Sequence, residues 1–142
     1  MNKWVLLEHK VYFTKSVDIH YDFLVENGKD CLTWKFLKLP LLNQASIEIY
    51  KQPNHRLVWL SRIEHELSDN RGFVKRIDHG IFKNVSDKLD SEYYRFILDG
   101  KLLYGLFEIW GNFCRLSKND EYSLINKRNI SIENFCKLVI LI

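Results

Sequence analysis

The sequence predicts a mainly β fold: a small closed or nearly closed antiparallel β-barrel with little helix. Three observations support this prediction. Aromatic side chains, which favour strands, make up 14% of the 142 residues. Short apolar runs alternate with turn-forming residues along the chain. The spacing of apolar residues that is typical of an amphipathic helix is weak. A set of about ten short strands is typical of a barrel, with a sandwich as the alternative.

The strand-like runs follow one another along most of the chain. The expected strands are 4–8, 19–26, 31–37, 46–51, 56–63, 73–77, 81–84, 93–98, 102–109 and 122–126, and the expected turns are 27–28, 53–54, 69–70, 79–80, 99–100 and 118–120. The pair Asp99-Gly100 lies between two apolar runs and predicts a hairpin with a type I′ turn. Ser131 could cap a short helix that runs to Leu141, although this segment could equally be a last strand.

Length and charge limit the class of protein. A chain of 142 residues fits one domain, so a single domain over residues 1–142 is expected. Apolar residues make up 46%, which supports a core and excludes a disordered chain. The net charge of +3 is compatible with nucleic-acid binding without predicting it.

The cysteines and the chain's apolar runs predict a cytoplasmic protein without membrane contact. Cys31, Cys114 and Cys136 are odd in number and show no CxxC spacing, and each has an apolar or aromatic neighbour. Buried, reduced thiols are therefore expected. The sequence does not open on a secretory signal pattern, and its longest apolar run, Leu138 to Ile142, is too short to cross a bilayer.

His20 and Asp22 are the first candidates for chemistry. They lie two positions apart in an expected strand, so their side chains should project from the same face. An imidazole beside a carboxylate can be half of a metal site, an acid–base pair, or a surface hydrogen bond. His9 could reach the same patch from a neighbouring strand about 5 Å away. Two imidazoles and a carboxylate would suit manganese, zinc or iron.

Seven segments, taken in order, resemble the motifs of one known family. They are Leu7-Glu8-His9, His20-Tyr21-Asp22-Phe23, Leu32-Thr33-Trp34-Lys35 with Leu39-Pro40, Asn54-His55-Arg56-Leu57, the stretch 72–82, Gly100-Lys101-Leu102 with Gly105, and the stretch 122–128. On these motifs the chain resembles the 3′-phosphoesterase domain of bacterial DNA ligase D and its small stand-alone relatives. The resemblance covers about residues 4–128, and residues 129–142 form a C-terminal extension without a counterpart.

The resemblance implies an activity and a set of site residues. The family is a compact β-barrel that trims 3′-terminal ribonucleotides and 3′-phosphates at DNA ends with a divalent metal, typically manganese. By resemblance, His9, His20 and Asp22 are the metal ligands, and His55 contacts the scissile phosphate or acts as a general acid. The implied partners are DNA or RNA–DNA 3′ ends, with a ligase or polymerase acting in trans.

The chain departs from the family where phosphate is bound. Leu24 stands at the position where the family has an arginine that binds phosphate. The family has a second phosphate-binding arginine in the strand that corresponds to 46–51, and this strand has no arginine here. Arg56, next to His55, is the expected substitute, with Arg62, Arg71 and Lys75 as alternatives. These cations, with Lys35, Lys38 and Arg76, could also form a basic face interleaved with Trp34 and Trp59, unless the tryptophans lie in the core.

Three functions therefore remain open. The first is a divergent metal-dependent 3′-phosphoesterase. The second is a catalytically weak or inactive barrel that binds nucleic acid or a protein partner. The third is a metal-dependent enzyme for a different phosphate ester.

Overall fold

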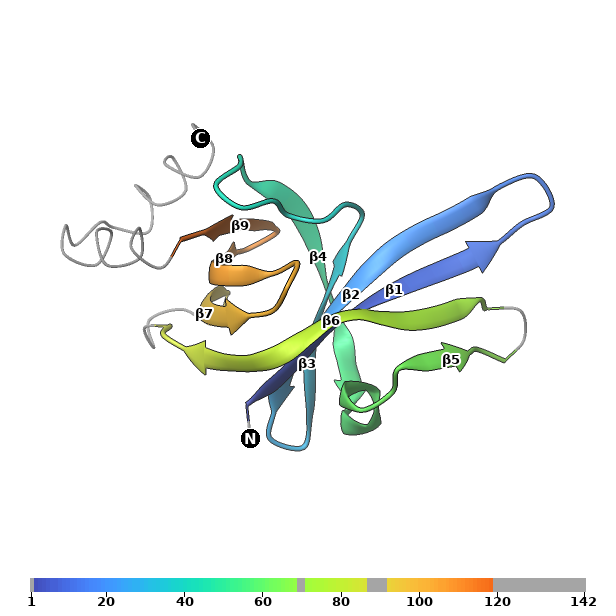
Figure 1. Ribbon diagram of the computed structural model, residues 1–142, viewed down its shortest axis with the longest axis horizontal. Helices are drawn as coiled ribbons and strands as arrows, with labels where there is room; N and C mark the ends of the chain where they lie inside the picture. Colours follow the sequence, from blue (N-terminus) through green and yellow to red (C-terminus); the bar gives the residue numbers. More distant parts are fainter. Residues whose placement is uncertain (1, 69–70, 87–91, 119–142) are drawn as a thin grey trace. The chain divides into compact units, whose positions relative to one another are not determined.

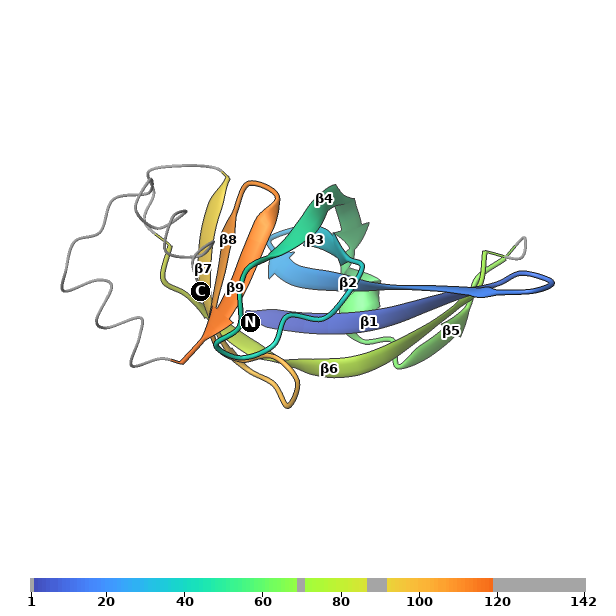
Figure 2. The ribbon, with the colours of Figure 1, turned by 90° about the horizontal axis from the view of Figure 1, so that it is seen from above.

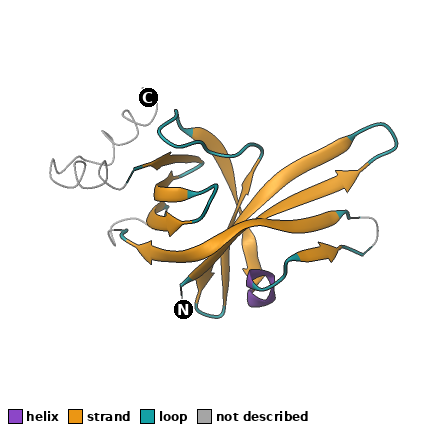
Figure 3. Cartoon of the chain, viewed as in Figure 1, coloured by secondary structure: helices purple, strands orange, loops and turns teal. Residues whose placement is uncertain are grey.

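The described structure is almost entirely β. The computed structural model describes residues 2–68, 71–86 and 92–118 (Figure 1). Its elements are β1 (Lys3–Tyr12), β2 (Val17–Asn27), β3 (Asp30–Phe36), β4 (Ile47–Arg56), the 3₁₀ helix η1 (Leu57–Leu60), β5 (Glu64–Glu66), β6 (Phe73–Asn84), β7 (Tyr93–Asp99), β8 (Tyr104–Trp110) and β9 (Phe113–Ser117). Figure 3 shows η1 as the single helical element among the described residues. The prediction of a mainly β chain with little helix is confirmed.

The strands are hydrogen-bonded in a ring. All strand pairs are antiparallel, in the order β1-β2-β3-β4-β9-β8-β7-β6-β5, and β1 also pairs with β6. A ring leaves few unpaired edges, as expected for a nearly closed barrel. The contacts within the chain divide it into two compact units: residues 1–39 with 49–81, and residues 40–48 with 82–142.

The first unit is built around the long β1–β2 hairpin. Leu7 pairs with Asp22, and His9 pairs with His20. The expected turn at Gly28 connects β2 to β3, and its φ of +70° explains why glycine occupies this position. The β1–β2 and β5–β6 hairpins project in the same direction (Figures 1 and 2). The pairing of β1 with β6 holds them side by side.

Both faces of this hairpin are covered in its middle. On one face Phe23 contacts Trp4 and Phe36 at ring-centroid distances of 5.9 Å and Trp34 at 6.1 Å. The next residue, Leu24, points to the opposite face because side chains alternate along a strand. There the buried cluster is Val5, Leu7, Leu24, Cys31 and Val74, and Trp59, Leu60 and Leu67 pack against it. Two-sided burial explains why the apolar runs in β1 and β2 are continuous.

The second unit contains a meander of β7, β8 and β9 with charges in its interior. Arg95 lies opposite Glu108, and Glu108 lies opposite Arg115. All three residues are buried, and Arg95 Nε lies 3.5 Å from Glu108 Oε2. Tyr93 Oη also donates to Glu108 Oε2 at 3.3 Å. The carboxylate therefore has a cation and a hydrogen-bond donor beside it, as a buried charge requires.

The strand expected over 56–63 is wrong. β4 ends at Arg56, and the next four residues form η1. Trp59 and Leu60 then turn onto the apolar cluster of the first unit. A short apolar run does not distinguish a strand from a helical turn by itself.

The turn expected at Pro53-Asn54 is also wrong, because both residues lie within β4. Gln52 pairs with Thr33 and His55 with Cys31, so two residues of β4 oppose one of β3. Such a bulge accommodates a proline, which cannot donate to the strand ladder.

Two further turn predictions need correction. The turn at His79-Gly80 is wrong, because β6 runs without a break from Phe73 to Asn84. The β7–β8 hairpin at Asp99-Gly100 is confirmed, but its type I′ turn is wrong. The loop has four residues, Gly100 N donates to Leu103 O, and Gly100 lacks a positive φ.

Neither β5 nor β9 is among the strands that the sequence predicts. The strand expected at 122–126, the alternatives for 131–141 and Cys136 lie outside the described residues.

In the described ranges, no helix has the length and apolar character needed to cross a membrane.

Candidate metal centre

His9, His20 and Asp22 converge in the first unit. The direct pairing of His9 with His20 places both rings on one face, and the period of the strand adds Asp22. His9 Nδ1 lies 3.2 Å from His20 Nε2, which lies 3.5 Å from Asp22 Oδ2. One ligand atom from each residue lies within 4.8 Å of the others. The predicted convergence of these three side chains is confirmed.

A hydrogen bond to the backbone orients the ring of His9. His9 Nε2 lies 2.8 Å from the carbonyl oxygen of Arg71, which can only accept, so Nε2 carries the hydrogen. The other ring nitrogen, Nδ1, faces His20. His20 Nε2 thus lies between His9 Nδ1 and a carboxylate oxygen of Asp22.

This arrangement fits a divalent cation. Three donor atoms, two nitrogens and one oxygen, lie close enough together to bind one cation. A metal-binding histidine usually donates its other N–H to a carbonyl or carboxylate, which is the contact that His9 makes with Arg71. The side chains of His20 and Asp22 are 20% and 12% exposed, so the cluster can be reached from solvent.

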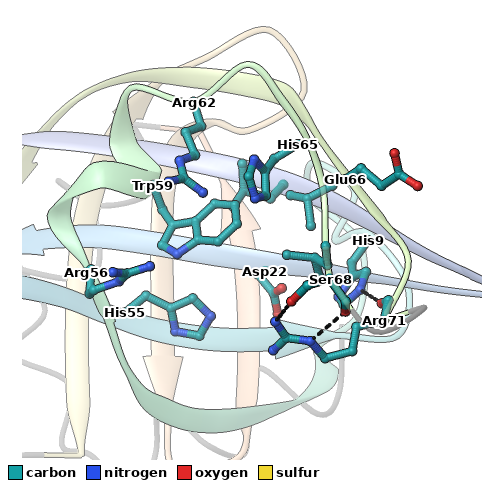
Figure 4. A pocket seen from close by; sticks show the side chains of 13 residues that line it. His9, Asp22, His55, Arg56, Trp59, Arg62, His65, Glu66, Ser68 and Arg71 are labelled. Atoms are coloured by element: carbon teal, nitrogen blue, oxygen red, sulfur yellow. Dashed lines mark hydrogen bonds between the residues drawn. The ribbon is translucent and has the colours of Figure 1, made fainter.

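The cluster borders a cavity of about 1000 Å³. His9 and Asp22 line this cavity together with His55 and Arg56, so the sequence-predicted residues meet there (Figure 4). Arg62 and Arg71 add two further guanidinium groups to the wall. Glu66 also lines the wall. Among the described residues, none of these three arginines forms an ion pair, so no carboxylate contact within that part of the chain neutralises them.

His55 is oriented by the backbone of its own strand. Its Nδ1 lies 3.0 Å from the carbonyl oxygen of Pro53 and therefore donates to it. This contact leaves Nε2 as the ring atom that can accept or donate elsewhere. Arg56 is exposed at the end of β4.

His65 joins Trp59 and Arg62, two members of the basic face considered from the sequence, at the wall of the cavity. Trp59 lies with its ring centroid 5.5 Å from that of His65, edge to face. The guanidinium of Arg62 lies 4.7 Å from the centroid of Trp59, within cation–π range. His65 lies in β5, and its place at the wall depends on β5 and η1 coming together in the fold. Trp34, by contrast, is buried in the core, so it does not belong to a basic face.

Leu24 lies beneath the cavity and does not reach it. It is fully buried and belongs to the apolar cluster under Trp59 and Leu67. The position at which the resemblance predicts an arginine in other proteins is thus part of the core in this chain.

The buried thiols do not take part in this site. Burial raises the pKa of Cys31 to about 11, and the carboxylates of Asp30 and Glu26 add to the shift. Burial also raises the pKa of Cys114. Both thiols are neutral near pH 7, which makes them poor nucleophiles and agrees with the expected structural role.

A scan of known protein families finds no match to this chain, and no curated protein matches it in sequence.

Proposed function

We propose that this protein is a metal-dependent phosphoesterase that acts on nucleic-acid 3′ ends. One observation carries the proposal: the His9–His20–Asp22 cluster borders a cavity whose wall holds three arginines and His55. The metal would be manganese, zinc or another divalent cation. The resemblance of the sequence motifs to the 3′-phosphoesterase family supports the same activity.

The residues at the cavity would have different roles in such a reaction. His9, His20 and Asp22 would hold the cation, whose chemistry is to neutralise phosphate charge and activate water or a hydroxyl group. The arginines neutralise the remaining phosphate charge and orient the ester. Their contribution increases in the transition state, where negative charge shifts onto the leaving oxygen.

His55 supplies a proton-transfer group. Its Nδ1 is engaged with Pro53 O, so Nε2 faces reaction partners. In the protonated state Nε2–H can donate a hydrogen bond to phosphate or a proton to the leaving oxygen. The same contact holds the ring in one orientation, which limits the entropy lost when substrate binds.

The proposal is tested on DNA primers. Primers labelled at the 5′ end and ending in one ribonucleotide or in a 3′-phosphate are incubated with the protein and Mn²⁺. The expected result is loss of the ribonucleotide or phosphate. His20→Ala should slow this reaction by at least about 100-fold, because it removes a ligand of the cation.

The matched control is His79→Ala, which removes an exposed histidine of β6 outside the cavity and should leave the rate unchanged. Unaltered primer ends after long incubation of the Mn²⁺-loaded wild type would count against the proposal. Hydrolysis of a small phosphodiester in the same experiment would point to a different phosphate ester as substrate.

A second function is favoured by the burial of Leu24. Loss of the arginine at this position is compatible with a barrel that binds nucleic acid or a protein partner without turnover. Calorimetry with Mn²⁺ and Zn²⁺ separates the two functions. The enzyme requires metal binding that His20→Ala abolishes, whereas the binding protein does not.

A further inference from the structure

Arg71, in the loop between β5 and β6, contacts both the candidate metal cluster and the cavity. The carbonyl oxygen of Arg71 accepts the hydrogen bond from His9 Nε2 at 2.8 Å. The side chain of Arg71 lines the cavity, where Figure 4 shows it between His55 and Ser68. The backbone of Arg71 thus orients His9, a candidate metal ligand, while its guanidinium group lines the cavity.

The guanidinium of Arg71 is held in place before any ligand binds. Its Nε donates to the carbonyl oxygen of Ser68 at 3.1 Å, and its Nη2 donates to Ser68 Oγ at 3.0 Å. A guanidinium has more N–H groups than these two contacts use, so donors remain for an anion. Because the group is already ordered, binding costs less side-chain entropy. Its flat fork matches the oxygens of phosphate.

The backbone of the loop is positioned against β1. Gly72 has a φ of +105°, and a Cβ at this residue would lie 2.1 Å from the carbonyl oxygen of Lys10. Only glycine permits this approach. Leu67 N donates to Gly72 O at 2.8 Å and closes the loop. The close approach of Gly72 to Lys10, the residue after His9, brings the carbonyl group of Arg71 to the His9 ring.

The other two arginines of the wall are placed differently. Arg62 lies over the ring of Trp59. Arg56 is exposed, and among the described residues its side chain makes no polar contact. Arg71 is therefore the cavity arginine that is both held by hydrogen bonds and tied to the cluster.

We propose that Arg71 binds the phosphate group of the ligand in this cavity, the role that Leu24 cannot fill. This inference rests on the proposed function, because it takes a phosphate ester as the ligand. It assigns the phosphate contact to Arg71. The sequence favours Arg56 for this contact, because Arg56 is adjacent to His55. Ser68 is the positioning residue, since it acts through the guanidinium.

The experiment measures two affinities of the same protein by calorimetry. Mn²⁺ is titrated into the protein, and inorganic phosphate or a nucleoside 3′-monophosphate is then titrated into the Mn²⁺-loaded form. Arg71→Ala keeps the backbone carbonyl, so Mn²⁺ affinity should stay within about 2-fold. Phosphate affinity should fall about 10- to 100-fold, because charge-assisted hydrogen bonds are lost. Arg71→Lys should restore only part of it.

Two further variants serve as controls. Ser68→Ala should weaken phosphate binding in the same direction by a smaller factor and leave Mn²⁺ affinity unchanged. Lys29→Ala removes one exposed positive charge on the β2–β3 hairpin, outside the cavity, and should change neither affinity.

The inference is overturned if Arg71→Ala binds phosphate as the wild type does, if Lys29→Ala causes an equal loss, or if the Mn²⁺-loaded wild type does not bind phosphate. Failure of the proposed function gives a different result. In that case phosphate binds through Arg71, but the 3′ ends of the primers remain unaltered.

Discussion

The arginines of the two compact units differ in burial and in partners. In the second unit Arg95 and Arg115 are each 4% exposed and flank the buried carboxylate of Glu108 across the strands. In the first unit Arg56 and Arg71 are exposed, and with Arg62 they line a cavity without forming an ion pair among the described residues.

This difference shows how the same side chain serves stability in one place and binding in another. A buried guanidinium must be neutralised by a carboxylate within the fold, because leaving it alone would cost several kcal/mol, roughly the stability of a domain. The cavity arginines stay hydrated, so the fold does not need to neutralise them. Their matching anion can come from outside, and phosphate is one such anion.

The largest expected effect comes from breaking the buried set. Glu108→Gln keeps the shape of the side chain and removes the negative charge between Arg95 and Arg115. We expect the free energy of unfolding to fall by about 3–5 kcal/mol, as when one partner of a buried ion pair is removed. Urea denaturation followed by circular dichroism measures this change.

Arg71→Ala is the comparison variant for that experiment. An exposed arginine of the cavity should change the free energy of unfolding by no more than about 0.5 kcal/mol. Equal losses in Glu108→Gln and Arg71→Ala would show that the two sets of arginines do not differ as described.

A smaller effect is expected from adding metal to the first unit. Mn²⁺ at about 100 times its dissociation constant should raise the free energy of unfolding by about 2.7 kcal/mol, because the cation binds the folded chain. Asp22→Asn should lose this gain, since its amide is a weaker ligand than the carboxylate. The measurement is urea denaturation with and without Mn²⁺. Equal stabilisation of the variant would mean that Mn²⁺ binds elsewhere.

The smallest effect tests whether the core beneath the cavity excludes water. Burial, with Asp30 and Glu26, raises the pKa of Cys31 from its ordinary value of 9.0 to about 11. The folded state therefore holds the thiol proton more tightly than the unfolded state. This contribution to stability is full below pH 9 and is lost as the pH rises toward about 11.

The loss attributable to Cys31 should be on the order of 2 kcal/mol. Unfolding curves at pH 8 and pH 11 measure it, with Cys31→Ala as the variant in which this part disappears. Cys114 remains in that variant and also has a raised pKa, so some alkaline destabilisation should persist. An unchanged pH dependence in Cys31→Ala would place the thiol in contact with water.

Local patterns allowed much of the fold to be predicted from the sequence. The side chains of a strand alternate every residue, so the facing of His20 and Asp22 follows from their spacing alone. The turn at Gly28 follows from a residue that tolerates positive φ. Two of the predictions that failed, at Pro53-Asn54 and over 56–63, concern segments in which a bulge or a distant apolar cluster overrides the local pattern.

The candidate site needed more than local pattern. His9 meets His20 because β1 and β2 adopt one register, and Arg71 meets His9 across 62 positions of the chain. The burial of Leu24 depends on η1 covering it.

The sequence by itself therefore determined the strand content and the facing of His20 with Asp22, because both depend on a period of two residues within one strand. Only the tertiary structure decided that His9 completes the cluster, that Leu24 belongs to the core, and that Arg71 stands beside the cavity. These features depend on strand register and on which apolar surfaces cover one another. Many pairings satisfy the same local pattern, and the packing of the folded chain selects one of them.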